Sequence, residues 1–133
     1  MSFNHVVIWL DHQEAHVIHF NHEAAEAEHL RAHSTHRKQH HKAGSVGSGH
    51  AEMDVALMND IADAVAGSTE ILVTGPGSAK LHLMRHFIEK RSAIGKKVVG
   101  VETTDHPNDA QLLAYARTYF VKVDRMLGDS ILA

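Results

Sequence analysis

The sequence predicts an α/β fold in which residues 1–133 form one domain, a mixed five-stranded sheet with helices on its faces. Two patterns support this prediction. Three strand-length segments near the N-terminus are separated only by short turns, which is typical of an antiparallel meander. After residue 52, segments with helical spacing alternate with short apolar segments, as in parallel strands joined by crossover helices. A chain of 133 residues with a hydrophobic fraction of 44% is ordinary for one domain with its own core.

The first half of the chain contains the three segments of the expected meander. Residues 5–10, HVVIWL, form a continuous apolar run rich in β-branched side chains, which is typical of a central strand buried on both faces. Residues 14–21, EAHVIHFN, follow after a short turn, so the two segments should form a hairpin. Residues 26–32 are more polar, which favours a strand at the edge of the sheet.

The second half predicts three helices separated by two strands. The first helix is expected at residues 53–66, the second between Ser78 as its cap and Gly95, and the third after residue 108, with strands at 70–73 and 97–101. The expected apolar faces are Leu57, Ile61, Ala64 and Val65 in the first helix, Leu81, Met84, Phe87 and Ile88 in the second, and Leu112, Leu113, Ala116, Phe120 and Val123 in the third. The resulting order, β-β-β-α-β-α-β-α, is a ribonuclease-H-like topology, which by itself carries no function.

Composition excludes several classes of protein. The chain has no cysteine, which removes disulfides, thiolate zinc sites and cysteine nucleophiles, and suits a reducing compartment. We expect no signal peptide, and no stretch approaches the roughly 18 apolar residues that a membrane span needs. A cytoplasmic protein without a membrane partner is therefore expected. The net charge is −3 with the 14 histidines neutral, so the charge rises in mild acid.

Residues 33–52 differ from the sequence on both sides and are expected to be an inserted basic, glycine- and histidine-rich loop. Residues 33–50, HSTHRKQHHKAGSVGSGH, contain no carboxylate, whereas residues 51–70 contain no lysine or arginine. A basic segment poor in apolar side chains cannot bury itself, and its charge favours contact with an anion, of which nucleic acid is the abundant one in the cytoplasm. The expected RNA-binding residues are Arg37, Lys38, His40, His41, Lys42, Gly44, Gly47 and Gly49.

The same loop contains a second possible chemistry, metal binding. His36 and His40 are spaced i,i+4, and His41 and His50 would complete a set of imidazole ligands for zinc. A glycine-rich loop is a poor preorganised cage, and the HExxH pattern is absent. We therefore expect no cofactor and keep zinc on these four histidines as the alternative.

Two other patterns suggest different functions. A two-metal nuclease needs several carboxylates at the ends of strands. Asp11 and either Glu52 or Asp54 are candidates, but the strand at 70–73 is followed by Thr74 and Gly75, so the set is incomplete. Residues 75–80, GPGSAK, precede a helix, where an anion can bind, but they match neither the phosphate-binding loop nor the dinucleotide fingerprint. A tight turn followed by a helix cap is the favoured interpretation.

Two segments carry a resemblance to a known family. Residues 70–80, EILVTGPGSAK, and residues 105–116, DHPNDAQLLAYA, resemble the middle domain of the eukaryotic and archaeal class-I peptide-chain release factors and their ribosome-rescue relatives. That domain has the same order of elements, and its long loop before the first helix carries a Gly-Gly-Gln tripeptide. The whole chain also resembles a release-factor-like group of small bacterial proteins often labelled translational machinery proteins, which share the HHKAGS…GSGH loop and the DHP turn.

The resemblance implies a translation-related protein whose partner is the ribosome, through rRNA or tRNA. Gly-Gly-Gln is absent, and residues 47–50, GSGH, stand in its place, so a binding protein is favoured over an enzyme. One alternative is a hydrolase of a peptidyl-tRNA-type ester in which His50 or His41 activates water, with or without zinc. Another is a histidine-rich scaffold that self-associates. The family's codon-reading and C-terminal domains have no counterpart here, so a free-standing middle domain is expected.

Overall fold

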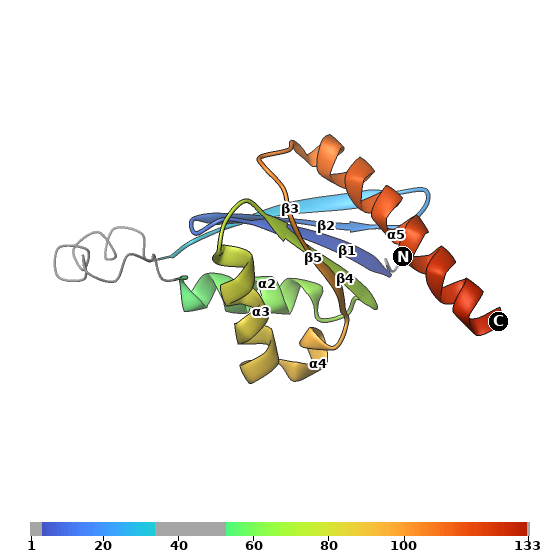
Figure 1. Ribbon diagram of the computed structural model, residues 1–133. Coiled ribbons are helices and arrows are strands. Elements are labelled where there is room, and N and C mark those ends of the chain that lie inside the picture. The colour runs from blue at the N-terminus through green and yellow to red at the C-terminus, as the bar shows by residue number, and fades with distance from the viewer. Residues whose placement is uncertain (1–3, 34–52, 133) are drawn as a thin grey trace.

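The computed structural model describes residues 4–33 and 53–132, which form five strands and four helices (Figure 1). The strands are β1 (His5–Leu10), β2 (Glu14–Phe20), β3 (Ala25–Arg31), β4 (Glu70–Gly75) and β5 (Val98–Thr103). The helices are α2 (Val55–Val65), α3 (Ala79–Lys90), the short α4 (Ser92–Gly95) and α5 (Asp109–Leu132). No helix in the described part of the chain is long and apolar enough to cross a membrane.

The strands form one mixed sheet in the order β3-β2-β1-β4-β5. β1 pairs antiparallel with β2 and parallel with β4, and β4 pairs parallel with β5. The meander therefore lies on one side of β1 and the parallel strands lie on the other. This arrangement confirms the predicted α/β fold, with β1 as the central strand and the exposed β3 at an edge.

Helices cover both faces of the sheet. α2 and α3 pack on one face, and α5 crosses the other (Figure 1). Side chains alternate along β1, so Val6, Ile8 and Leu10 face α2 and α3, while Val7 and Trp9 face α5. Because both faces are covered, β1 needs an apolar side chain at every position after His5, which explains the continuous run HVVIWL.

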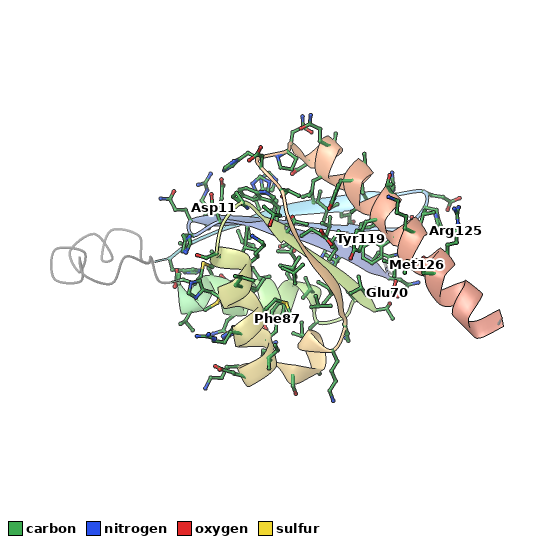
Figure 2. All side chains as sticks on the ribbon, viewed as in Figure 1. Asp11, Glu70, Phe87, Tyr119, Arg125 and Met126 are labelled. Atoms are coloured by element: carbon green, nitrogen blue, oxygen red, sulfur yellow. The ribbon has the colours of Figure 1, made fainter. Side chains whose placement is uncertain are left out.

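The predicted apolar face of α3 was partly wrong. The helix buries Ala79, Leu83 and Phe87, and Phe87 points into the core (Figure 2). Leu81 and Ile88 are 59% and 63% exposed. Residues 79, 83 and 87 are spaced four apart, which helical periodicity allows as well as it allows the predicted set, so periodicity alone cannot choose between the two faces. Packing of α3 against the sheet and α2 decides which face is buried.

The ends of α3 also differ from prediction. Ser78 occupies the N-cap position, but its side chain makes no capping hydrogen bond. Its φ of −86° and ψ of −8° are helical, whereas a capping serine normally has an extended backbone that directs its hydroxyl to the first turn. The helix ends at Lys90, and Gly95 instead closes α4.

Candidate nucleic-acid interface at the carboxyl edge of the sheet

The three parallel strands end at the same edge of the sheet, which we call the carboxyl edge. Asp11 follows β1 at this edge, and Glu70 begins β4 at the opposite edge (Figure 2). The turn at 11–13, the turn at 75–78 and the connection at 104–108 all lie at the carboxyl edge, because they follow β1, β4 and β5. β3 also ends here, since it runs parallel to β1 across the meander. Open α/β sheets commonly bind ligands at this edge.

The two described flanks of the basic segment are joined at the carboxyl edge. The backbone N–H of His33 donates to Asp54 Oδ2, and His33 Nε2 lies 2.7 Å from Asp60 Oδ2. Asp54 is 7% exposed and caps α2, because its Oδ1 accepts a 3.0 Å hydrogen bond from the Ala56 N–H. We call His33, Asp54 and Asp60 the loop base. They tie the end of β3 to the start of α2, so the described residues on the two sides of 34–52 lie next to each other.

The loop base leads to a stability prediction. Asp54→Ala should lower the free energy of unfolding by about 2 kcal/mol, because it removes the cap of α2 and leaves the His33 N–H without its carboxylate. Asp60→Ala is the matched control, because it deletes an exposed carboxylate whose ion pair should contribute less than about 1 kcal/mol. Urea unfolding followed by circular dichroism measures both. Equal losses of unfolding free energy in the two variants would show that the cap of α2 contributes no more than the exposed ion pair.

The residues predicted to bind RNA or metal lie outside the described residues. They stay predictions. The residues for RNA are Arg37, Lys38, His40, His41, Lys42, Gly44, Gly47 and Gly49, those for zinc are His36, His40, His41 and His50, and the one for catalysis is His50 or His41. The structure adds the place in the fold at which this segment is attached.

The carboxylates of the nuclease alternative do not come together among the described residues. Asp11 Oδ1 accepts hydrogen bonds from the backbone N–H groups of Gln13 and Glu14, at 2.8 and 2.9 Å, and so closes the β1–β2 turn. Neither Asp11 nor Asp54 belongs to a group of side chains in the described ranges that could share a metal ion. Asp11 and Asp54 therefore have structural roles, and Glu52 lies outside the described residues.

The turn between β4 and α3 is packed tightly. A Cβ at Gly75 would collide with the carbonyl oxygen of Leu10, so only glycine allows this approach of β4 to β1. Lys80 is 8% exposed, and its Nζ donates to the carbonyl oxygen of Gly77 at 2.5 Å. The lysine therefore holds the turn together, which supports the structural interpretation of residues 75–80.

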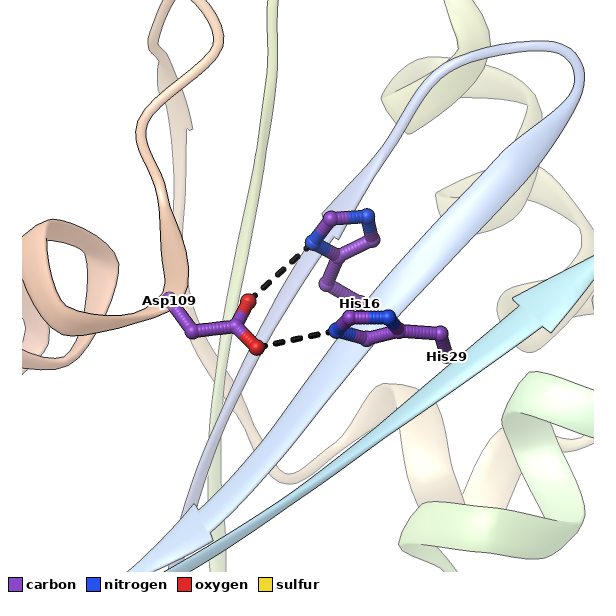
Figure 3. Close-up of side chains that lie close together, drawn as sticks. All are labelled: His16, His29 and Asp109. Carbon is purple, nitrogen blue, oxygen red and sulfur yellow. Dashed lines mark hydrogen bonds and ion pairs between the residues drawn. The ribbon is translucent and has the colours of Figure 1, made fainter.

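A cluster of two histidines and an aspartate was missed by sequence reasoning. His16 on β2 lies directly opposite His29 on β3, with ring centroids 4.1 Å apart, and both rings reach the carboxylate of Asp109 (Figure 3). Burial alone would raise the pKa of Asp109, but hydrogen bonds from His29 and His16 and the charge of these histidines together hold that pKa below its ordinary value. The register of the β2–β3 pair could have predicted that His16 and His29 lie side by side. No sequence pattern connects them to Asp109.

The comparisons with known proteins concern the fold. No protein-family model matches the chain, and no curated protein sequence does. Among solved structures, Pelota from Archaeoglobus fulgidus matches 100% of this chain and 36% of its own, with a TM-score of 0.65 and 15% identity. Pelota from Thermoplasma acidophilum matches 84% of this chain and 31% of its own, with a TM-score of 0.56 and 14% identity. The archaeal translation termination factor aRF1 matches 96% of this chain and 41% of its own, with a TM-score of 0.52 and 11% identity.

These matches define the class of fold. The chain has the fold of a domain shared by Pelota and an archaeal release factor, and it spans about a third of the length of those proteins. The fold expected from the release-factor resemblance is thereby confirmed.

Proposed function

We propose that this protein is a translation-related, ribosome- or RNA-binding protein that contacts rRNA or tRNA through residues 33–52. The observation that carries the proposal is the loop base, which attaches this basic segment, free of carboxylates over residues 33–50, at the carboxyl edge of the sheet. The fold supports it, because its solved neighbours include a translation termination factor and yeast Dom34, named as a translation termination-like factor in RNA quality control. The Dom34 match has a TM-score of 0.51 and 12% identity, and covers 93% of this chain and 39% of that chain.

The chemistry of the segment suits a phosphate backbone. Lysine and arginine neutralise phosphates and release counterions, and glycines let the chain approach closely. Histidines that protonate below neutral pH would add to the attraction. α2 would instead repel phosphates, because it carries Asp60 and Asp63 and no lysine or arginine. Contact with RNA should therefore be confined to the loop. In this role the protein is cytoplasmic, has the ribosome as its partner and needs no cofactor.

The proposal predicts salt-dependent binding that rests on the loop cations. Lys38→Ala combined with Lys42→Ala should weaken binding to ribosomes or labelled rRNA and reduce the slope of log affinity against log salt by about 1.5. Lys90→Ala combined with Lys96→Ala is the matched control, because both lysines are exposed near the opposite edge and the charge change is the same. Fluorescence anisotropy over a salt series, together with co-sedimentation with ribosomes, measures both effects.

Other results would point elsewhere. Absent or salt-independent binding, or equal effects of the two double variants, would contradict an RNA-binding loop. Release of peptide from a ribosome complex, lost in His50→Ala, would support the ester hydrolase instead. Self-association that depends on concentration, without RNA binding, would support the scaffold.

A further inference from the structure

We propose that His16, His29 and Asp109 form a binding site for a divalent transition metal ion, with Zn²⁺ as the expected ion. The three side chains come from β2, β3 and the first residue of α5, and they meet on the face of the sheet that α5 covers (Figure 3). This site lies in the described part of the chain and is separate from the loop histidines.

The distances fit a small ion. His16 Nδ1 lies 3.2 Å from Asp109 Oδ1, and His29 Nε2 lies 2.9 Å from Asp109 Oδ2. Ligands of tetrahedral zinc stand about 2.0–2.1 Å from the ion and hence roughly 3.3 Å from one another. The ring planes differ by 21°, and both nitrogens point toward the same carboxylate (Figure 3). The three ligand atoms lie within 4.8 Å of one another, so only small movements would be needed to enclose an ion.

The protein holds the ligands in position. His16 and His29 are register partners on neighbouring strands, which fixes the spacing of their backbones. The start of α5 is fixed by two reciprocal hydrogen bonds, from the Asn108 N–H to Gln111 Oε1 at 2.9 Å and from the Gln111 N–H to Asn108 Oδ1 at 2.8 Å. Asp109 follows Asn108 directly. Ligands carried by rigid elements lose little freedom when a metal binds.

A carboxylate also lies near the other ring nitrogen of His16, at ion-pair distance rather than hydrogen-bond distance. With Nδ1 on the metal, the other ring nitrogen carries its proton, and His16 Nε2 lies 3.7 Å from Glu14 Oε1. Arg31 Nη2 in turn lies 3.8 Å from the same oxygen. A carboxylate behind a histidine fixes its tautomer and makes it a better ligand. Glu14 would become a positioning residue for this site by closing to hydrogen-bond distance when the metal binds.

The chemistry of the donors favours a transition metal over calcium or magnesium. Two imidazoles and one carboxylate are a zinc ligand set, whereas the hard cations prefer oxygen ligands only. The side chains of His29 and Asp109 are 53% and 36% exposed, which leaves room for water at a fourth position. A second group, His5 with Glu70 and Asp124, offers one imidazole and a 4.0 Å separation, so it suits zinc less well.

The test needs a background without the loop histidines, because they are the competing zinc site. The background protein carries alanine at His36, His40, His41 and His50. Isothermal titration of this metal-free full-length chain with ZnCl₂ at pH 7.5 should retain one strong site per chain. If strong binding disappears in this background, the zinc site belongs to the loop and the proposal is wrong.

Variants of the cluster then locate the retained site. Loss of an outer partner alone weakens metal binding about 10–100-fold, and Glu14→Gln should fall in this range. His29→Ala and Asp109→Asn each remove a ligand, so each should weaken zinc binding more than about 100-fold. His19→Ala is the matched control, because His19 lies on β2 with its side chain on the other face of the sheet. Circular dichroism checks that each variant is folded. Unchanged affinity in folded His29→Ala and Asp109→Asn would overturn the proposal.

Trp9 supplies a second, local readout. It is the single tryptophan of the chain, and its ring centroid lies 5.3 Å from that of His16. Zinc should change Trp9 fluorescence emission in the background protein and in His19→Ala, with a midpoint at the zinc concentration that calorimetry gives for half-saturation. The same zinc concentrations should leave the emission of His29→Ala unchanged. An emission change that persists in His29→Ala would place the ion elsewhere. None of these measurements involves RNA or ribosomes, so the metal site and the proposed function succeed or fail separately.

Discussion

Trp9→Ala should lower the free energy of unfolding by about 3–5 kcal/mol, the largest effect that we expect of a single substitution. Trp9 is 3% exposed in the core between the sheet and α5, and its Nε1–H donates to the carbonyl oxygen of Asp105 at 2.6 Å. Its ring also lies against His106, with centroids 4.9 Å apart. Alanine would therefore leave a cavity and free the connection between β5 and α5.

The control for this substitution is Trp9→Phe, which keeps most of the ring and loses the hydrogen bond. It should cost about 1–2 kcal/mol, measured by urea unfolding with far-ultraviolet circular dichroism. If phenylalanine costs as much as alanine, the hydrogen bond to Asp105 outweighs the packing. Trp9→Ala should also weaken zinc binding more than Trp9→Phe does, because Asp109 follows the connection that Trp9 holds.

Gly75→Ala should lower the free energy of unfolding by about 3 kcal/mol. The new methyl group would meet the carbonyl oxygen of Leu10, a backbone atom that cannot move without disturbing the β1–β4 pairing. The control is Gly77→Ala in the same turn, where a Cβ meets no atom within 4 Å. That change should be neutral or stabilise by about 0.4–1 kcal/mol, because alanine restricts the unfolded chain.

The two glycines give a direct comparison by thermal or urea unfolding. Similar stabilities for Gly75→Ala and Gly77→Ala would show that β4 does not approach β1 as closely as the structure has it. A large loss confined to Gly75→Ala would support the interpretation of residues 75–80 as a tightly packed structural turn.

Much of the fold was predictable because strands and crossover helices leave strong local patterns. The predicted strand at 5–10 matches β1, and the sheet order follows from a meander joined to crossovers. The face of α3 was not predictable, because Leu81 and Leu83 both satisfy helical periodicity. Ser78 is at the predicted cap position, but its helical backbone directs the hydroxyl away from capping. Local sequence places an element more reliably than it orients one.

The candidate sites also have a part that the sequence shows and a part that only the structure shows. The basic composition of residues 33–52 is visible in the sequence alone, and it indicates a polyanion as partner. The roles of Asp54 and Asp60 in holding that segment were not predicted, because they depend on contacts with His33, more than twenty residues away. The contact between His29 and Asp109 was not predicted either, because these residues are 80 positions apart in the sequence.

The sequence by itself determined the class of fold, the order of its elements and the presence of one basic segment that lacks carboxylates over residues 33–50. These properties depend on hydrophobic periodicity, turn residues and charge, which act between near neighbours. The tertiary structure alone decided which face of α3 is buried, where the basic segment is tied, and that His16 and His29 share the carboxylate of Asp109. Those features depend on strand register and on how helices dock against the sheet, which packing of the whole chain sets.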